Sequence, residues 1–157
     1  MILVSACLCG INCKYSGGNN ETDWVKKLYD TGKAVLVCPE CLGNMEIPRP
    51  PHEIIGGNGA DVLSGIARVM SKNKEIDSTD KFIKGAKLSL ELAKKHHIKL
   101  AILKSKSPSC GCGKIYDGTF SGKTIDGNGV ACQLLIDNGI KIINEEDYDK
   151  WRDLNEL

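Results

Sequence analysis

Four short apolar runs constrain the fold more than any other feature of this chain. They occupy residues 2–6, 34–37, 100–103 and 140–143. Each run is nearly continuous rather than alternating, which is typical of parallel strands that are covered on both faces. Helical patterns separate the runs along the chain. The order of elements therefore predicts an open, mostly parallel sheet of about four strands with right-handed crossovers.

The helical segments are marked by apolar stripes and by residues that stop helices. The stripes predict helices over residues 21–30, 79–96 and 130–137, and the polar tail 145–157 predicts a last short helix. The first and third patterns end next to glycine, a common helix terminator. These helices are expected on both faces of the sheet. The fold class predicted from the sequence is thus a Rossmann-like α/β fold.

Residues 43–77 interrupt this alternation. The segment contains Pro48-Arg49-Pro50-Pro51 and the glycine-rich run 56–59. It predicts a long, ordered Gly/Pro-rich loop insertion with a hairpin around residues 66–76, and loops of this length are usually functional or disordered. No repeat or linker divides the chain, so we expect a single domain over residues 1–157.

Composition excludes several classes of protein. The 157 residues carry 21 basic and 20 acidic side chains, a net charge of +1, which gives no electrostatic reason to expect nucleic acid or an anionic membrane as partner. No stretch approaches the roughly 18 apolar residues of a membrane span. The N-terminus lacks the basic region of a signal peptide. We therefore expect a cytoplasmic protein with a small-molecule partner.

The chain has eight cysteines, and cysteines rarely form disulfides in the cytoplasm. Three of them follow predicted strands: Cys7 comes after the first, Cys38 after the second, and Cys110 lies in the loop after the third. The carboxyl ends of parallel strands share one edge of the sheet, where ligands bind. The sequence therefore predicts that these three thiols meet at one metal site.

The other cysteines are weaker candidates. Cys13 can be a fourth ligand, a sulfur-handling thiol or a structural residue. Cys9, Cys41 and Cys112 are each close in sequence to a stronger candidate, and Cys132 in the third helix is expected in the core. The CxxC pair of Cys38 and Cys41 follows a strand, so a thioredoxin-like redox pair stays open as an alternative.

Two kinds of polar residue near these cysteines suggest chemistry. Glu40 is two residues past Cys38 at the same sheet edge, where a carboxyl group can shuttle protons or simply cap the following segment. Ser107 and Ser109 flank Pro108 just before Cys110, and their hydroxyls can bind substrate or shape the turn.

The identity of the metal follows from the ligand type. Soft thiolates suit both zinc and iron–sulfur clusters. Structural zinc needs four ligands, whereas ligands scattered over three strand ends favour a working cofactor such as a 4Fe-4S cluster. If only three thiolates bind the cluster, one iron is left open as a Lewis acid toward sulfur.

Several motifs, taken in order, resemble the thiouracil desulfidase (TudS-like) family. The resemblance extends from residue 2 to about residue 148. The motifs that carry it are Ser5-Ala6-Cys7-Leu8, Cys13-Lys14-Tyr15, Cys38-Pro39-Glu40, Pro48-Arg49-Pro50 with Glu53, Ser107-Pro108-Ser109-Cys110-Gly111 and Ile115-Tyr116-Asp117-Gly118-Thr119-Phe120.

The resemblance implies an enzyme that removes sulfur from a thiolated pyrimidine, such as thiouracil, or a similar thio-compound. Water would replace the sulfur without net redox change. The family pattern implies a 4Fe-4S cluster held by Cys7, Cys38 and Cys110. It also implies Glu40 as general acid and base, with Ser107 positioning the substrate or a proton.

The chain departs from the family pattern at Cys9, Cys41 and Cys112, and Cys13 matches a family cysteine without a clear role. These extra thiols leave alternative ligation, or zinc in place of the cluster, open. A second hypothesis is therefore a metal-binding or sulfide-carrying module without turnover, and a third is a thiol oxidoreductase that uses Cys38 and Cys41.

Overall fold

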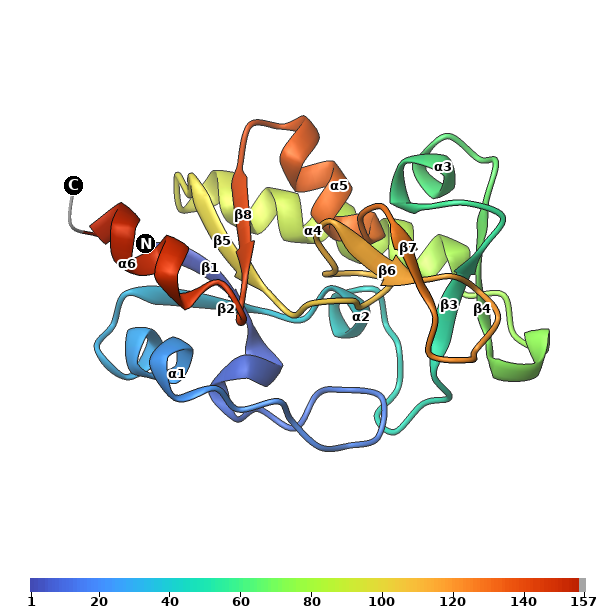
Figure 1. Ribbon diagram of the computed structural model, residues 1–157, viewed down its shortest axis with the longest axis horizontal. Coiled ribbons are helices and arrows are strands. Elements are labelled where there is room, and N and C mark those ends of the chain that lie inside the picture. The colour runs from blue at the N-terminus through green and yellow to red at the C-terminus, as the bar shows by residue number, and fades with distance from the viewer. Residues whose placement is uncertain (156–157) are drawn as a thin grey trace.

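The computed structural model describes residues 1–155 and contains the predicted parallel sheet. Within this range the sheet has four strands in the order β2-β1-β5-β8, and every neighbouring pair is parallel. The strands are β1 (Ile2–Ser5), β2 (Ala34–Val37), β5 (Leu100–Leu103) and β8 (Lys141–Asn144). The predicted fold class is confirmed, and the predicted strand boundaries are correct to within one residue (Figure 1).

Helices cover both faces of this sheet. Side chains of Val4 and Ile102 point to one face, where they pack with α1 (Asp23–Asp30) and α6 (Tyr148–Asn155). Leu3, one residue before Val4, and Leu103, one residue after Ile102, point to the other face. There they pack with α4 (Thr79–Lys95) and α5 (Val130–Asp137). Both faces are therefore buried, which explains why the strands are continuously apolar in sequence. Figure 1 shows α4 and α5 behind and above the sheet and α1 on its opposite side.

The segment from 43 to 77 contains more regular structure than the predicted loop. It forms β3 (His52–Ile55), α3 (Gly59–Leu63), β4 (Arg68–Ser71) and the 3-10 helix η2 (Lys72–Lys74). The hairpin expected around residues 66–76 is present only in part: Met70 and Asp77 form one antiparallel bridge, and the Ser71 N–H donates to the Ile76 carbonyl at 2.8 Å. The main partner of β4 is β3, which was not predicted.

A second hairpin and two short helices were not predicted. The hairpin joins β6 (Lys114–Tyr116) to β7 (Thr124–Asp126). The short helices, η1 (Ala6–Cys9) and α2 (Pro39–Leu42), directly follow β1 and β2. Each element is only three or four residues long, too short to show a helical or strand period in the sequence.

The two hairpins share a small core with the N-terminal halves of α4 and α5. Its buried side chains include Ile54 and Val69 from the first hairpin, Ile115 from the second, Phe82 from α4 and Val130 from α5. This core fixes the hairpins at the end of the sheet, at the right of Figure 1. We call the β3–β4 and β6–β7 hairpins together the hairpin unit.

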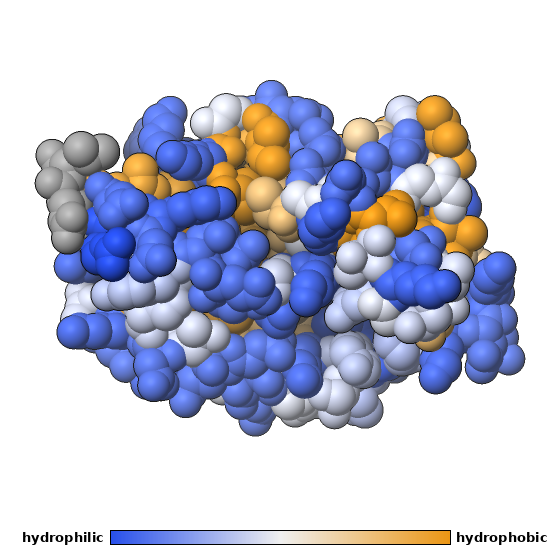
Figure 2. Space-filling view, in the orientation of Figure 1, coloured by the Kyte–Doolittle hydropathy of each residue, from blue (hydrophilic) through white to orange (hydrophobic). Residues whose placement is uncertain are grey.

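The surface and the tail complete the fold. On the face in Figure 2, apolar side chains gather in the upper part, toward α5 and α3, and the lower part is mainly hydrophilic. The described residues 1–155 contain no helix long and apolar enough to cross a membrane. The predicted tail helix begins at Tyr148 rather than residue 145, and residues 156–157 lie outside the described part of the chain.

Candidate active site

A cavity of about 480 Å³ lies at the carboxyl edge of the sheet, between the sheet and the hairpin unit. Its sheet side is lined by Cys7, Cys38, Glu40 and Cys110, and its other side by residues of the hairpins such as Glu53. This is the edge at which open α/β sheets bind ligands.

The structure brings Cys7, Cys38 and Cys110 to this one cavity. Cys7 lies in η1, immediately after β1, and Cys38 is the N-cap of α2, immediately after β2. Cys110 lies in the turn that follows β5. Since β2, β1 and β5 are neighbours in the sheet, the three thiols come from three adjacent strand ends. The expected meeting of distant segments is thus observed.

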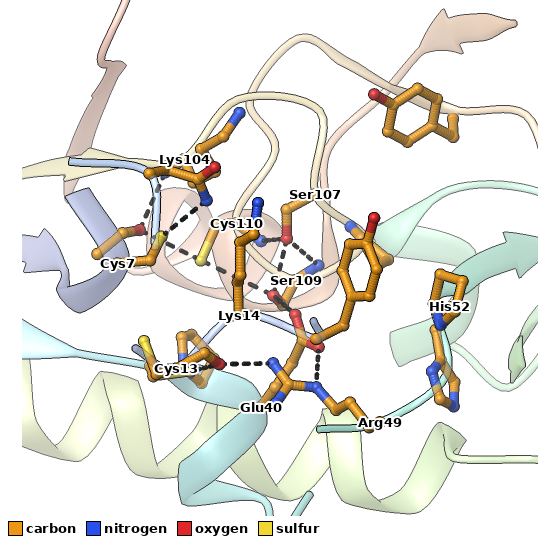
Figure 3. Close-up of a pocket in the computed structure, with 18 of the residues that line it drawn as sticks. Cys7, Cys13, Lys14, Glu40, Arg49, His52, Lys104, Ser107, Ser109 and Cys110 are labelled. Carbon is orange, nitrogen blue, oxygen red and sulfur yellow. Dashed lines mark hydrogen bonds and ion pairs between the residues drawn. The ribbon is translucent and has the colours of Figure 1, made fainter. Parts of the chain in front are cut away.

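Two of these thiols are buried and supported by polar side chains. The Ser5 hydroxyl lies 3.4 Å from Cys110 Sγ, and Asn20 Nδ2 donates to Cys7 Sγ at 3.4 Å (Figure 3). Burial raises the pKa of Cys110 to about 12 and also raises the pKa of Cys7. Neither the Ser5 side chain nor Asn20 was predicted to support the site. Ser5 is the last residue of β1, a position that signals the site edge, whereas nothing in the sequence indicates Asn20.

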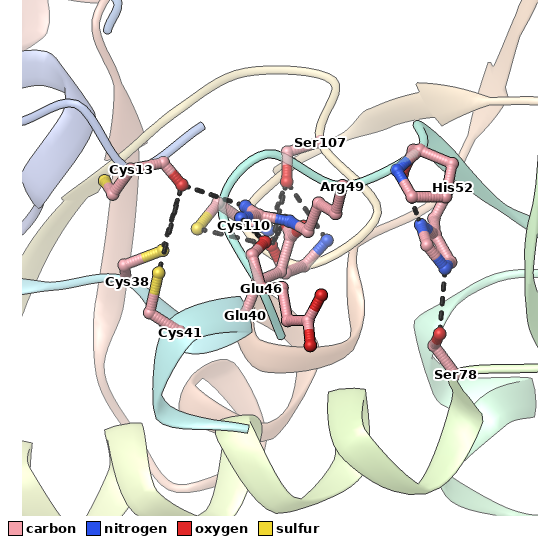
Figure 4. Close-up of polar contacts among 12 residues, drawn as sticks. Cys13, Cys38, Glu40, Cys41, Glu46, Arg49, His52, Ser78, Ser107 and Cys110 are labelled. Atoms are coloured by element: carbon pink, nitrogen blue, oxygen red, sulfur yellow. Dashed lines mark hydrogen bonds and ion pairs between the residues drawn. The ribbon is translucent and has the colours of Figure 1, made fainter. Parts of the chain in front are cut away.

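Cys38 differs from the other two because further thiols surround it. The Cys38 and Cys41 sulfurs both lie 3.9 Å from the Cys13 carbonyl oxygen (Figure 4). A hydrogen bond with the Cys13 thiol lowers the pKa of Cys38 to about 6 and raises that of Cys13. Burial raises the pKa of Cys41 to about 11. Cys13 lines the cavity, whereas Cys41 is not among its lining residues and packs against the core on the α1 side of the sheet.

Glu40 lies in α2 and faces the cavity through a defined set of partners. Its Oε1 accepts a hydrogen bond from Arg49 Nε at 3.0 Å, and its Oε2 accepts one from the Ser109 hydroxyl at 2.8 Å. The Ser107 hydroxyl lies 2.9 Å from that of Ser109 and accepts the Cys110 N–H at 3.0 Å. Ser107 therefore shapes the turn at Cys110 and lies one hydroxyl away from Glu40.

Arg49 fixes this carboxylate, a role that was not predicted from the sequence. Its side chain is only 4% exposed, against 15% for that of Glu40. The other guanidinium nitrogens donate to the carbonyl oxygens of Cys13 at 2.9 Å and Glu46 at 3.0 Å. Proximity to Glu40 raises the pKa of Arg49 despite its burial. Arg49 thus ties the loop that carries Cys13 to the carboxylate of α2.

The remaining cysteines lie away from the cavity lining. Cys9 is buried with its sulfur 3.9 Å from the Val25 carbonyl oxygen, and Cys132 is buried in α5, as predicted. Cys112 contacts the Cys132 thiol, and this contact lowers the pKa of Cys112 to about 7. These positions favour structural roles for Cys9 and Cys132.

The donor set fits a cluster of several metal atoms. Within residues 1–155, no three His, Cys, Asp or Glu side chains converge so as to hold one metal ion. A single zinc ion requires ligand sulfurs no more than about 4.6 Å apart, since each Zn–S bond is about 2.3 Å. In an iron–sulfur cluster each thiolate binds a different iron, so three thiols that line one cavity without converging on a single point suit a cluster.

Taken together, the fold and the site define an open-sheet α/β protein whose thiols line a substrate-sized cavity at the sheet edge. Comparison with known proteins makes the assignment specific. A model of the family described as 2-thiouracil desulfurase matches residues 2–147, so this chain belongs to that family, which confirms the resemblance carried by the motifs.

One relative and one solved structure illustrate the similarity. The chain is 48% identical over 149 residues to the Bacillus subtilis (strain 168) protein named "Uncharacterized protein YbbK", covering 95% of this chain and 98% of that one. It also matches the structure of the "[4Fe-4S]-dependent thiouracil desulfidase TudS" with a TM-score of 0.84 and 34% identity, over 99% of this chain and 98% of that chain. The fold described above is therefore shared with a protein that is named as a cluster-dependent desulfidase.

Proposed function

We propose that this protein is a 4Fe-4S-dependent desulfidase that converts thiouracil, or a similar thiolated pyrimidine, to the corresponding oxo-compound. The reaction consumes one water molecule and releases one hydrogen sulfide. A carbon–oxygen double bond replaces the carbon–sulfur double bond, with no net oxidation or reduction. The observation that carries the proposal is the meeting of Cys7, Cys38 and Cys110 in one cavity with the Glu40 carboxylate. Family membership and the likeness to TudS support the choice of cofactor and substrate.

In this proposal Cys7, Cys38 and Cys110 are the cluster ligands. Metal-binding cysteines must be thiolates, yet burial raises the pKa values of Cys7 and Cys110. Each thiolate also raises the pKa of its neighbours by charge repulsion. A cationic iron core would offset both effects, so these thiols would lose their protons when the cluster binds. When bound through three thiolates, the cluster supplies an open iron that acts as a Lewis acid toward a soft sulfur atom.

Glu40 is proposed to move the protons. A general base must reach the proton that it removes, directly or through one water molecule. Glu40 Oε1 accepts a hydrogen bond from Arg49 and Oε2 accepts one from Ser109, so the carboxyl group is held beside the cavity, where it can accept a proton from water. The same carboxyl group can then return the proton to the leaving sulfur or to a ring nitrogen.

Ser107 and Ser109 are proposed to orient this carboxylate and the attacking water. The Ser109 hydroxyl donates a hydrogen bond to Glu40 Oε2, and the Ser107 hydroxyl is hydrogen-bonded to the Ser109 hydroxyl. The two hydroxyls can pass a proton along the chain Ser107–Ser109–Glu40 by exchanging donor and acceptor roles. Ser107 acts in this scheme through Ser109 rather than by touching Glu40 itself.

The proposal is tested by anaerobic reconstitution of the purified protein with iron and sulfide. Metal content, the visible spectrum and conversion of 2-thiouracil to uracil are measured on the same sample. We expect about four irons per chain, release of one sulfide per uracil, no need for a reductant, and oxygen from labelled water in the product. Stoichiometric zinc with no cluster and no uracil would overturn the proposal in favour of a structural or carrier protein.

A further inference from the structure

Glu53 is a carboxylate of β3 to which the proposed reaction gives no role. The residue is 8% exposed and lines the cavity. Its Oε1 accepts two backbone hydrogen bonds, from Gly118 N–H at 2.9 Å and from Phe120 N–H at 3.2 Å. One carboxylate oxygen thus fixes the loop at residues 117–122, which joins β6 to β7 on the other hairpin.

The second oxygen of Glu53 has no hydrogen-bond partner within the described residues. Among residues 1–155, Oε2 makes no hydrogen bond, and no buried side-chain oxygen or nitrogen lacks a partner. Oε2 is therefore accessible to solvent, and the residue that carries it lines the cavity. The oxygens of an ionised carboxylate accept hydrogen bonds and cannot donate them. This oxygen is therefore suited to an N–H or O–H donor of a bound molecule.

The loop that Glu53 holds brings an aromatic ring to the cavity in a strained conformation. Phe120 has a φ of +56°, which is a genuine outlier for a bulky residue. Gly118 approaches β3 so closely that a Cβ there would lie 2.7 Å from the Ile54 carbonyl oxygen. Such strain persists only where surrounding contacts impose it, and it tends to mark functional positions. Here the Phe120 N–H and the Gly118 N–H both donate to Glu53, which is one of the contacts that hold this loop.

Aromatic residues are concentrated around this cavity. The chain contains only eight Phe, Trp and Tyr residues, and three of them, Tyr15, Tyr116 and Phe120, line it. Flat aromatic faces bind planar rings by stacking, which is tolerant of the ring's identity. Hydrogen bonds from polar groups such as Glu53 must then recognise the donors and acceptors at the edge of the bound ring.

We infer that Glu53, Tyr116 and Phe120 form the subsite that recognises a planar N–H-bearing heterocycle. Glu53 determines specificity in two ways: Oε1 positions the Phe120 loop against the ring, and Oε2 accepts a ring N–H. This inference deepens the proposed function and rests on it, because it assigns the residues that select the thiolated ring. It requires no covalent step.

The test compares wild type with Glu53→Gln on 2-thiouracil and on its 1-methyl and 3-methyl derivatives. The glutamine oxygen still accepts the two backbone N–H groups, while its amide nitrogen is a donor and cannot accept the ring N–H. Wild type should disfavour one of the two methylated rings by about 10- to 100-fold in kcat/KM, the value of a hydrogen bond to a charged group. Glu53→Gln should raise KM for 2-thiouracil by a similar factor, leave kcat near the wild-type value and lose that discrimination.

A second measurement does not depend on turnover. Calorimetry with uracil, which has the same ring N–H groups and no sulfur, should show weaker binding to Glu53→Gln than to wild type, in cluster-loaded and cluster-free protein alike. Glu91→Gln, on the exposed face of α4, serves as matched control and should change neither value. Equal iron content in all three proteins checks that the variants fold.

The outcomes separate this inference from the proposed function. Unchanged KM, discrimination and uracil binding in Glu53→Gln would overturn the inference while leaving the desulfidase intact. Wild type that binds uracil through Glu53 but converts no thio-compound would overturn the proposed function and retain the subsite. Failure of wild type to distinguish either methylated ring would also overturn the inference.

Discussion

The sheet and the hairpin unit contribute different parts of the cavity. The sheet supplies Cys7, Cys38 and Cys110 from adjacent strand ends, together with the carboxylate of Glu40. The hairpin unit supplies aromatic rings and Glu53. Helices bury both faces of the sheet, whereas the hairpin unit packs on a smaller core shared with α4 and α5. In our proposals the chemistry lies on the sheet side and recognition lies on the hairpin side.

Arg49 connects the two regions. It lies in the segment that leads into β3, yet its guanidinium contacts the Glu40 carboxylate and the carbonyl oxygen of Cys13. A buried arginine with these acceptor groups holds the hairpin segment against the thiol side. The two regions are therefore separable in role but coupled by one buried ion pair.

The largest expected effect is that of Glu40→Gln, which breaks the chemistry of the sheet side alone. The amide keeps the size of the side chain and can still accept from Arg49, but it cannot take a proton. We expect unchanged iron content and a fall in kcat of about 10²- to 10⁴-fold, the usual contribution of a general acid–base. Steady-state kinetics on reconstituted protein checks this. Full activity would remove the role assigned to Glu40.

Arg49→Met tests the connection between the regions. Removing one partner of a buried ion pair leaves an uncompensated charge and costs about 3 kcal/mol. We expect the free energy of unfolding to fall by that amount in urea titrations, with a further loss of kcat because Glu40 is no longer held.

The matched control for this variant is Arg68→Met, in the exposed pair of Arg68 with Asp77. Exposed pairs contribute about 0–1 kcal/mol, so this change should be small. Equal costs for the two variants would show that Arg49 does not connect the regions.

Phe120→Gly separates stability from recognition in the hairpin unit. Glycine adopts a positive φ without strain, so the variant should be as stable as wild type or up to about 1 kcal/mol more stable. Its KM for 2-thiouracil should nevertheless rise, because the ring is lost from the cavity. Thermal melts and kinetics on the same preparation measure both effects.

His97→Gly is the control for this variant, since His97 has a φ of +54° at the exposed end of α4, far from the cavity lining. It should gain similar stability with unchanged KM. An unchanged KM in Phe120→Gly as well would contradict a recognition role for this ring.

The smallest expected effect is a pH dependence of the hairpin unit. His52 in β3 is buried, and its ring nitrogens lie 2.8 Å from the Ser78 hydroxyl and from the Pro50 carbonyl oxygen. Burial lowers the pKa of His52 from 6.5 in the folded protein. The unfolded chain therefore binds this proton first, and stability falls as the pH drops below 6.5, by at most about 1.4 kcal/mol per pH unit. Urea titrations at about pH 7.5 and pH 5.5, on either side of the ordinary histidine pKa, should show less of this loss in His52→Gln.

The sequence predicts the sheet better than the hairpin unit for a physical reason. The run 100–103 is recognised because it is continuously apolar, and the helix pattern 79–96 is long enough to show its period. The positions of Cys7 and Cys38 follow from the strand ends. The pairing of β3 with β4 spans α3, so no local turn signal marks it. The contacts of Arg49 and Asn20 depend on the meeting of distant segments, which no spacing in the chain reveals.

The central claim is that three thiols at adjacent strand ends hold the cluster, and a cysteine scan tests it most directly. Cys7→Ser, Cys38→Ser, Cys110→Ser, Cys13→Ser and Cys41→Ser are reconstituted anaerobically, and iron content and the visible spectrum are recorded for each. We predict that each of the first three loses the four-iron cluster, while Cys13→Ser and Cys41→Ser keep it and retain most of their desulfidase activity. The claim would be contradicted if Cys13→Ser or Cys41→Ser lost the cluster while any of the first three variants kept it. The cluster would then have a different set of ligands.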